Sequence, residues 1–133
     1  MDWVASIHQA IQYIEEHLRE ELTIREIAQQ AALSPFYFQK GFAMLCGITA
    51  GDYIRQRRLS AAGLEVLTTD RKIIDIALEF GYDSPDSFTK AFVRFHGLTP
   101  AALRKSGGAV RSFAPLRIKL TLGRWSKHGL QRL

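Results

Sequence analysis

The hydrophobic residues of this chain recur at helical spacing through most of its length. In roughly residues 3–20 they fall every three or four positions with acidic residues between them, which predicts an amphipathic helix. They are Ile7, Ile11, Ile14 and Leu18. Helical patterns continue to about residue 105, whereas residues 115–123 alternate apolar and polar positions, as a strand does. The pattern therefore predicts an all-α chain whose C-terminal tail contains a single strand.

Helix start and stop signals divide this helical region into segments. Thr23 and Glu26 form a capping box, in which each side chain accepts a hydrogen bond from the other residue's backbone amide. Three other predicted N-caps, Ser34, Ser84 and Thr99, precede proline at the first helical position, where its missing N–H would have no intrahelical partner. The further N-caps are expected at Ser34, Thr49, Asp70, Ser84 and Thr99. Two glycines, Gly47 and Gly97, stand where a left-handed residue would end a helix.

The chain contains an internal repeat. Residues 34–42 read SPFYFQKGF and residues 84–92 read SPDSFTKAF, while the segments before them match with one extra residue, Asp83, in the second copy. Each copy predicts a helix of about eight residues, a short turn and a helix of about twelve, which is the helix-turn-helix plan. The two units are expected over about residues 23–46 and 72–96, joined by a linker helix over about residues 50–67.

The second helix of each copy has an apolar face and an opposite polar face. The apolar stripes are Phe38, Phe42 and Leu45 in one copy, and Phe88, Phe92 and Phe95 in the other. This spacing is typical of a packed core. The opposite arcs carry Phe36, Gln39, Lys40 and Ala43, and Asp86, Thr89, Lys90 and Val93. Amide, ammonium, hydroxyl and aromatic groups of this kind can contact base edges, so the repeat predicts two recognition helices for successive major-groove segments.

Composition and charge narrow the class of protein. With 133 residues, of which 47% are hydrophobic, the chain can form one domain or two very small ones that share a core. The formal charge is +5, and no acid follows Asp86, whereas ten lysines and arginines do. Such an excess of basic residues in one part of the chain favours binding to a polyanion, and double-stranded DNA is the partner we expect.

Several classes of protein are disfavoured. No run of 18 apolar residues and no secretory signal is present, so a cytoplasmic protein without a membrane segment is expected. The lone Cys46 cannot form an intrachain disulfide or a cysteine-rich zinc site and is expected to be buried filler. The four histidines lack metal-ligand spacing, and no nucleophile motif occurs. We therefore expect no enzyme activity, no metal and no cofactor.

Two runs carry a family resemblance. Residues 53–67 read YIRQRRLSAAGLEVL, and residues 73–104 read IIDIALEFGYDSPDSFTKAFVRFHGLTPAALR. With the first unit they resemble the DNA-binding domain of AraC/XylS transcription regulators, over about residues 23–104. The resemblance implies seven helices, with this domain over residues 1–105, and binding as a monomer to an asymmetric promoter site. It also implies an activator with RNA polymerase as a partner.

The resemblance also assigns base-reading positions. In the first unit they are Phe36, Gln39 and Lys40. In the second they are Pro85, Asp86, Ser87, Thr89 and Lys90, with Arg94 a candidate phosphate contact. Asp86, Val93 and Leu103 depart from the family pattern. Asp86 has two interpretations, an acceptor for a cytosine amino group or an acid stabilised in the first helical turn. Arg58 can be a structural anchor or a phosphate contact.

Two other segments and one alternative function remain open. Residues 106–133 form a basic tail that resembles the start of a truncated effector domain, of the ligand-sensing kind found in some relatives. The acidic residues of the first helix can serve solubility or contact RNA polymerase; they are Glu15, Glu16, Glu20 and Glu21. The alternative is a non-specific nucleic-acid-binding or architectural protein. The ratio of specific to non-specific DNA affinity, measured at a stated salt concentration, distinguishes it from a sequence-specific regulator. A membrane-surface peptide fits poorly, because the bases are not concentrated on one amphipathic helix.

Overall fold

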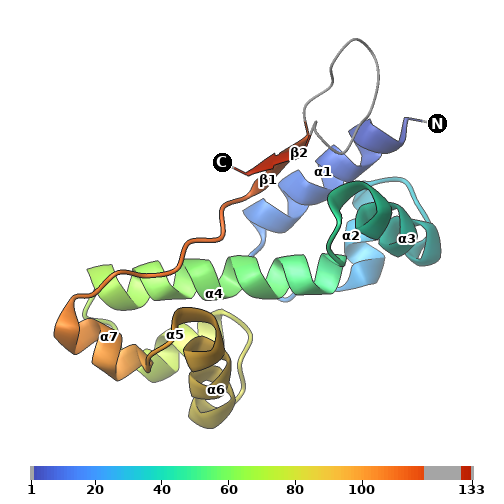
Figure 1. The fold of residues 1–133 in the computed structure, drawn as a ribbon. Coiled ribbons are helices and arrows are strands. Elements are labelled where there is room, and N and C mark those ends of the chain that lie inside the picture. The colour runs from blue at the N-terminus through green and yellow to red at the C-terminus, as the bar shows by residue number, and fades with distance from the viewer. Residues whose placement is uncertain (1, 119–129, 133) are drawn as a thin grey trace. The chain divides into compact units, whose positions relative to one another are not determined.

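A computed structural model describes residues 2–118 and 130–132 (Figure 1). These residues form two short strands and seven α-helices, the number of helices that the resemblance predicts. The helices are α1 (Trp3–Glu16), α2 (Ile24–Gln30), α3 (Pro35–Cys46), α4 (Ala50–Thr68), α5 (Ile73–Glu79), α6 (Pro85–His96) and α7 (Pro100–Ser106). The strands are β1 (Leu116–Ile118) and β2 (Leu130–Arg132).

The chain divides into two compact units, and the division falls within α4, between Ile54 and Arg55. The first unit contains α1, α2, α3 and the start of α4, together with the segment from Ala114 onward. The second contains the rest of α4, α5, α6 and α7, and ends at Phe113. Each unit therefore includes one of the two predicted helix-turn-helix motifs.

The core of the first unit is built by the apolar faces that the sequence predicts. Ile7 and Ile14 of α1, Ile27 of α2 and Phe42 of α3 are fully buried, and the Phe38 and Phe42 rings meet edge to face. Leu45 differs from its prediction, since it is only half-buried. The neighbouring Cys46 is buried instead, and burial raises the pKa of its thiol to about 12. The cysteine is filler, as predicted.

Aromatic rings from α6 form the core of the second unit. Phe88 and Phe92 are fully buried against Val66 of α4 and Ile76 of α5, within one hydrophobic cluster. Arg104 of α7 donates a hydrogen bond from Nε to the Val66 carbonyl at 3.0 Å. This carbonyl lies in the last turn of α4, where it has no intrahelical donor. Arg104 thus caps the C-terminal end of α4.

Most predicted helix starts are confirmed. Thr23, Ser34, Ser84 and Thr99 accept hydrogen bonds as N-caps, and the Thr49 hydroxyl accepts from the Asp52 amide. The prediction for Asp70 is wrong. Helix α5 begins after Lys72, which makes no side-chain cap bond. The reason lies upstream, because α4 continues to Thr68 and the hydroxyl of Thr69 bonds back to Glu65, which leaves Asp70 in the connection.

The turns of the two motifs share an unusual backbone conformation. Ala32 has φ of 58° and Gly81 has φ of 90°, both in the left-handed region that favours glycine. Glycine adopts this conformation without a steric cost, whereas in Ala32 the Cβ makes it sterically unfavourable. A Cβ at Gly81 would also lie 3.3 Å from a guanidinium nitrogen of Arg58. Arg58 packs at this turn, and desolvation lowers its pKa, which favours the structural-anchor interpretation.

Helix α1 ends earlier than its apolar pattern predicts. It stops at Glu16, and Leu18 is buried although it lies outside the helix. The His17 ring stacks on Tyr13 with centroids 4.1 Å apart, and its Nδ1 lies 2.7 Å from the Tyr13 carbonyl oxygen. A side chain thus takes part in the helix end, which a hydrophobic pattern cannot reveal. Glu20 and Glu21 consequently lie beyond α1.

The tail contains two strands where one was predicted. The strands β1 and β2 pair antiparallel, with Leu116 opposite Arg132 and Ile118 opposite Leu130. Residues 119–123 of the predicted strand lie outside the described residues. The backbone amide of Leu116 donates to the Tyr53 hydroxyl at 3.2 Å, and this hydroxyl donates to Glu15 at 2.7 Å. Tyr53 therefore joins the tail to α1 within the first unit.

Candidate nucleic-acid interface

The exposed face of α3 presents the predicted residues of the first motif. Phe36 retains 64% of its surface, and Gln39 and Lys40 are exposed as well. The Lys40 ammonium lies 5.8 Å from the centroid of the Phe36 ring, close enough for a cation–π interaction. The opposite face of the same helix packs into the core through Phe38 and Phe42. Burial on one side therefore directs these three side chains outward together.

Helix α6 presents the predicted residues of the second motif in two groups. Pro85, Asp86 and Lys90 are exposed, and so is Arg94 one turn further along. Thr89 is half-buried, as is Ser87. The Ser87 hydroxyl donates to the Ser84 carbonyl at 3.0 Å and accepts from the Ser84 hydroxyl at 2.9 Å. Ser87 thus stabilises the start of α6, and its hydroxyl would have to contact a base in addition to these two bonds.

The two lysines are held differently at equivalent positions of the repeat. Lys90 forms an ion pair with Asp86, with Nζ and Oδ2 3.2 Å apart and both side chains about three-quarters exposed (74% and 78%). Lys40 instead leans on the Phe36 ring, and Phe36 occupies the position that Asp86 has in the second copy. An exposed i,i+4 pair contributes only about 0.3–0.5 kcal/mol, so DNA phosphates can replace it readily. The two helices consequently offer different chemistry around a shared lysine.

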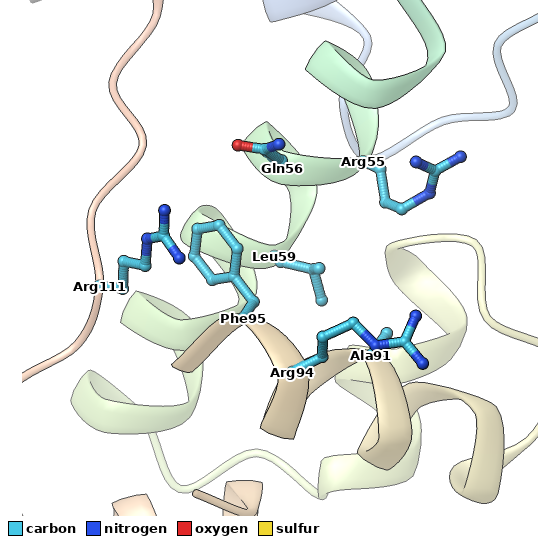
Figure 2. Close-up of a pocket in the computed structure, with 7 residues that line it drawn as sticks. All are labelled: Arg55, Gln56, Leu59, Ala91, Arg94, Phe95 and Arg111. Carbon is cyan, nitrogen blue, oxygen red and sulfur yellow. The ribbon is translucent and has the colours of Figure 1, made fainter. Parts of the chain in front are cut away.

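The second unit carries further arginines beside α6, and two of them, Arg55 and Arg111, were not among the predicted site residues. Arg94 of α6, Arg55 of α4 and Arg111 of the segment after α7 line one cavity of about 290 Å³ (Figure 2). The Arg111 guanidinium lies 5.0 Å from the centroid of the Phe95 ring. These residues come from three separate segments, so no local sequence pattern could have grouped them. The general signal, a base-rich stretch without acids after Asp86, was present for Arg94 and Arg111.

Hydrogen bonds hold the segment that carries Arg111 onto α4 and α6. The Arg111 amide donates to Nδ1 of His96 at 3.2 Å, and Nε2 of His96 lies 2.8 Å from the Leu59 carbonyl. Nδ1 therefore accepts and Nε2 carries the proton, so the imidazole is neutral. Burial, with the Arg111 charge as a smaller cause, lowers the pKa of His96, while the bond to Leu59 opposes the shift. Further along, Phe113 accepts from Arg57 and donates to the Ser60 hydroxyl.

The helix-turn-helix geometry agrees with comparisons to known proteins. A family model described as a helix-turn-helix domain matches residues 27–106. The regulatory protein SoxS of Escherichia coli (strain K12) is 41% identical over 98 residues, which cover 74% of this chain and 92% of SoxS. The chain belongs to the AraC/XylS family of DNA-binding transcription regulators. Its two motifs are therefore the paired helix-turn-helix units of an AraC-type DNA-binding domain.

Two further relatives extend this assignment. The HTH-type transcriptional activator AarP of Providencia stuartii is 36% identical over 100 residues, which cover 75% of this chain and 74% of AarP. The DNA-binding domain of the transcription factor AdpA, solved in complex with a target DNA, superposes with a TM-score of 0.70 at 26% identity. That match covers 76% of this chain and 91% of the AdpA chain. No helix among the described residues of this AraC-type regulator is long and apolar enough to cross a membrane.

Proposed function

We propose that this regulator is an activator that binds an asymmetric promoter site as a monomer, with α3 and α6 in successive major grooves. The observation that carries the proposal is the pair of inequivalent outward faces, Phe36-Gln39-Lys40 on α3 and, with Thr89 half-buried, Asp86-Thr89-Lys90 on α6. A symmetric dimer reads the same half-site twice, whereas two different faces in one chain read two different half-sites.

Each proposed contact follows from the chemistry of its side chain. Gln39 can bond an adenine edge in two places, and Thr89 can donate to or accept from several bases. Lys40 and Lys90 contact guanine or phosphate, while Phe36 can cover a thymine methyl group. Pro85, Asp86 and Ser87 lie at the start of α6, the end of a recognition helix that usually meets base edges, and Arg94 contacts phosphate.

Helix α4 has a length that suits this arrangement. Its 19 residues extend about 28 Å at about 1.5 Å per residue, against about 34 Å between successive major grooves on one face of DNA. Where the span falls short, a modest bend in the DNA closes the difference.

The acidic residues near the N-terminus support the activator part of the proposal. Glu16, Glu20 and Glu21 are exposed on a chain that is otherwise basic. DNA repels such a surface, which leaves it available to a protein, and RNA polymerase is the partner that an activator needs. AarP, described as a transcriptional activator, is one of the relatives.

The spacing of the two half-sites tests the proposal. Binding sites are first selected from a random DNA pool, and five base pairs are then inserted between the half-sites of the selected sequence. The insertion rotates one half-site to the far side of the duplex, so affinity should fall to that of a single half-site. Replacing five base pairs between the half-sites without changing their number is the matched control. A palindromic site bound by two chains, or affinity that the five-base-pair insertion leaves unchanged, contradicts the two-headed monomer. Equal affinity for selected and random DNA favours the non-specific alternative.

A further inference from the structure

The arginine-lined cavity of the second unit combines positive charge with an apolar floor. It has a volume of about 290 Å³, at the small end of the range of about 300–1,000 Å³ in which ligand pockets fall. Leu59 and Phe95 form the floor and are buried apart from 4% and 9% of their surfaces. In Figure 2 these two side chains lie between Arg111 and the pair Arg55 and Arg94.

The charge in this cavity is not neutralised by its lining. Arginine stays protonated at any physiological pH, and no acidic residue lines the cavity. The Arg94 guanidinium has no hydrogen bond or ion pair to any residue that the structure describes. Arg111 contacts the Phe95 ring through its guanidinium, while its backbone is held by His96. The cavity therefore combines positive charge that is present at any physiological pH with apolar surface.

This lining is not a requirement of the helix-turn-helix fold, as the first copy of the repeat shows. At the offset of the repeat, Gly41, Met44 and Leu45 of α3 correspond to Ala91, Arg94 and Phe95 of α6. These α3 residues line an apolar groove together with the Trp3 ring, which packs directly on Gly41. The same side of this helix thus carries Met44 in one unit and Arg94 in the other. A purely structural role would be served equally by either lining.

We propose that this cavity binds a small organic anion with an apolar body. The carboxylate of such a ligand forms charge-assisted hydrogen bonds with the arginines, which are about twice as strong as neutral ones. Its apolar body covers Leu59 and Phe95. A bare phosphate, or the phosphate of a DNA backbone, would satisfy the charge but leave the apolar floor exposed, so the floor favours an amphipathic ligand.

Binding at this cavity should alter DNA recognition by the same helix. Arg94 lies one turn beyond Lys90 on α6, and a ligand anion at Arg94 would place negative charge beside the proposed DNA-contacting face. We expect the ligand to weaken DNA binding as a consequence. This second step rests on the proposed function, whereas binding of the ligand does not.

Titration of the full chain with matched probes tests the site without DNA. Phenylacetate carries both a carboxylate and an apolar ring, phenylacetamide has the same shape without the charge, and inorganic phosphate has the charge without the ring. We expect phenylacetate to shift the NMR signals of Leu59 and Phe95 in a saturable manner, and the other two probes to bind at least about tenfold more weakly. Phosphate binding as tightly as phenylacetate, or no saturable shift with phenylacetate, overturns the proposal.

Charge-removing variants locate the contact. Arg94→Gln and Arg111→Gln should each remove one charge-assisted bond, and the variant that loses the carboxylate contact should bind phenylacetate about tenfold more weakly. Lys105→Gln is the control, since it removes a positive charge from an exposed residue of the same unit that does not line the cavity. If neither arginine variant weakens binding more than Lys105→Gln does, the site is wrongly placed.

DNA binding measured with and without phenylacetate separates the two steps. Weaker DNA binding in its presence supports the coupling. Unchanged DNA binding, with phenylacetate bound, overturns the coupling and leaves the site standing. Absence of any sequence-specific DNA binding would count against the proposed function alone, because the NMR titration contains no DNA.

Discussion

At the scale of single residues, several groups have two roles that compete. Asp86 illustrates this, because it is both an acid in the first turn of α6 and the ion-pair partner of Lys90. The first role stabilises the helix by about 0.3–1 kcal/mol through the helix dipole. The second occupies a lysine that we propose for DNA contact. Which role matters more can be decided by removing the charge alone.

Asp86→Asn distinguishes the two interpretations of this residue. If Asp86 mainly stabilises the first turn of α6, the substitution removes a charge that repels phosphates and frees Lys90. DNA affinity should then rise about fivefold, equivalent to about 1 kcal/mol. If Asp86 accepts from a cytosine amino group, affinity should fall and the preferred base should change at one position. We expect the first outcome in a titration by fluorescence anisotropy. Asp83→Asn, an exposed acid just before α6, is the control.

We expect the stability of the second unit to depend on pH through His96. The folded state favours neutral imidazole, since burial lowers the pKa of His96 and Nδ1 accepts from the Arg111 amide. The unfolded chain therefore binds more protons below its ordinary pKa of about 6.5. The stabilisation is present in full above that pH and is lost as the pH falls toward the lowered pKa of the folded state. Urea unfolding at several pH values should show this slope, and His96→Gln should flatten it. An unchanged slope in the variant would assign the effect to other groups.

At the scale of elements, the structure separates the acidic residues near the N-terminus into two kinds. Glu15 is half-buried and accepts a hydrogen bond from Tyr53, the same residue whose hydroxyl holds β1. Glu16 ends α1, and Glu20 and Glu21 follow it, all three exposed. Only the exposed three are suited to contact a partner protein, whereas Glu15 holds the unit together.

Substitutions in these two groups should have opposite effects. Changing Glu16, Glu20 and Glu21 together to glutamine should lower activated transcription several-fold in a promoter assay and leave DNA affinity unchanged. Glu15→Gln should instead lower the midpoint of thermal unfolding, because it weakens a hydrogen bond to a charged group, worth about 1.5–3 kcal/mol. Equal loss of transcription and DNA binding in the triple variant, or loss of neither, would contradict the contact with RNA polymerase.

At the scale of the whole molecule, local sequence patterns predicted the features that are set by residues close together in the sequence. The period of Ile7, Ile11 and Ile14, the Ser-Pro caps and the repeat itself led to the helices and to both motifs. Features made by distant residues were not predictable in the same way. The β1–β2 pairing depends on two segments meeting, and the end of α1 depends on the His17 side chain. The arginine-lined cavity joins three segments that no spacing rule connects.

The outward faces of α3 and α6 could be predicted, but the state of each side chain could not. Periodicity indicates which side of a helix is exposed, and Phe36, Gln39 and Lys40 are indeed exposed on one side. It says nothing of the hydroxyl of Ser87, which is engaged in capping, or of the pairing of Lys90 with Asp86. A side chain can bond to several nearby partners, and which one it bonds to depends on their positions in the folded structure.

The packing of Trp3 on Gly41 gives the first unit an optical signal of its own. The chain has two tryptophans, Trp3 and Trp125, and none between Arg55 and Phe113. A Cβ on residue 41 would collide with the indole ring, so glycine allows this contact, and the same groove is lined by Lys40. With Trp125 replaced by phenylalanine, indole fluorescence would come from Trp3 alone. Its quenching would follow engagement of α3 without interference from α6, and the order in which the two helices meet DNA would become measurable in a stopped-flow experiment.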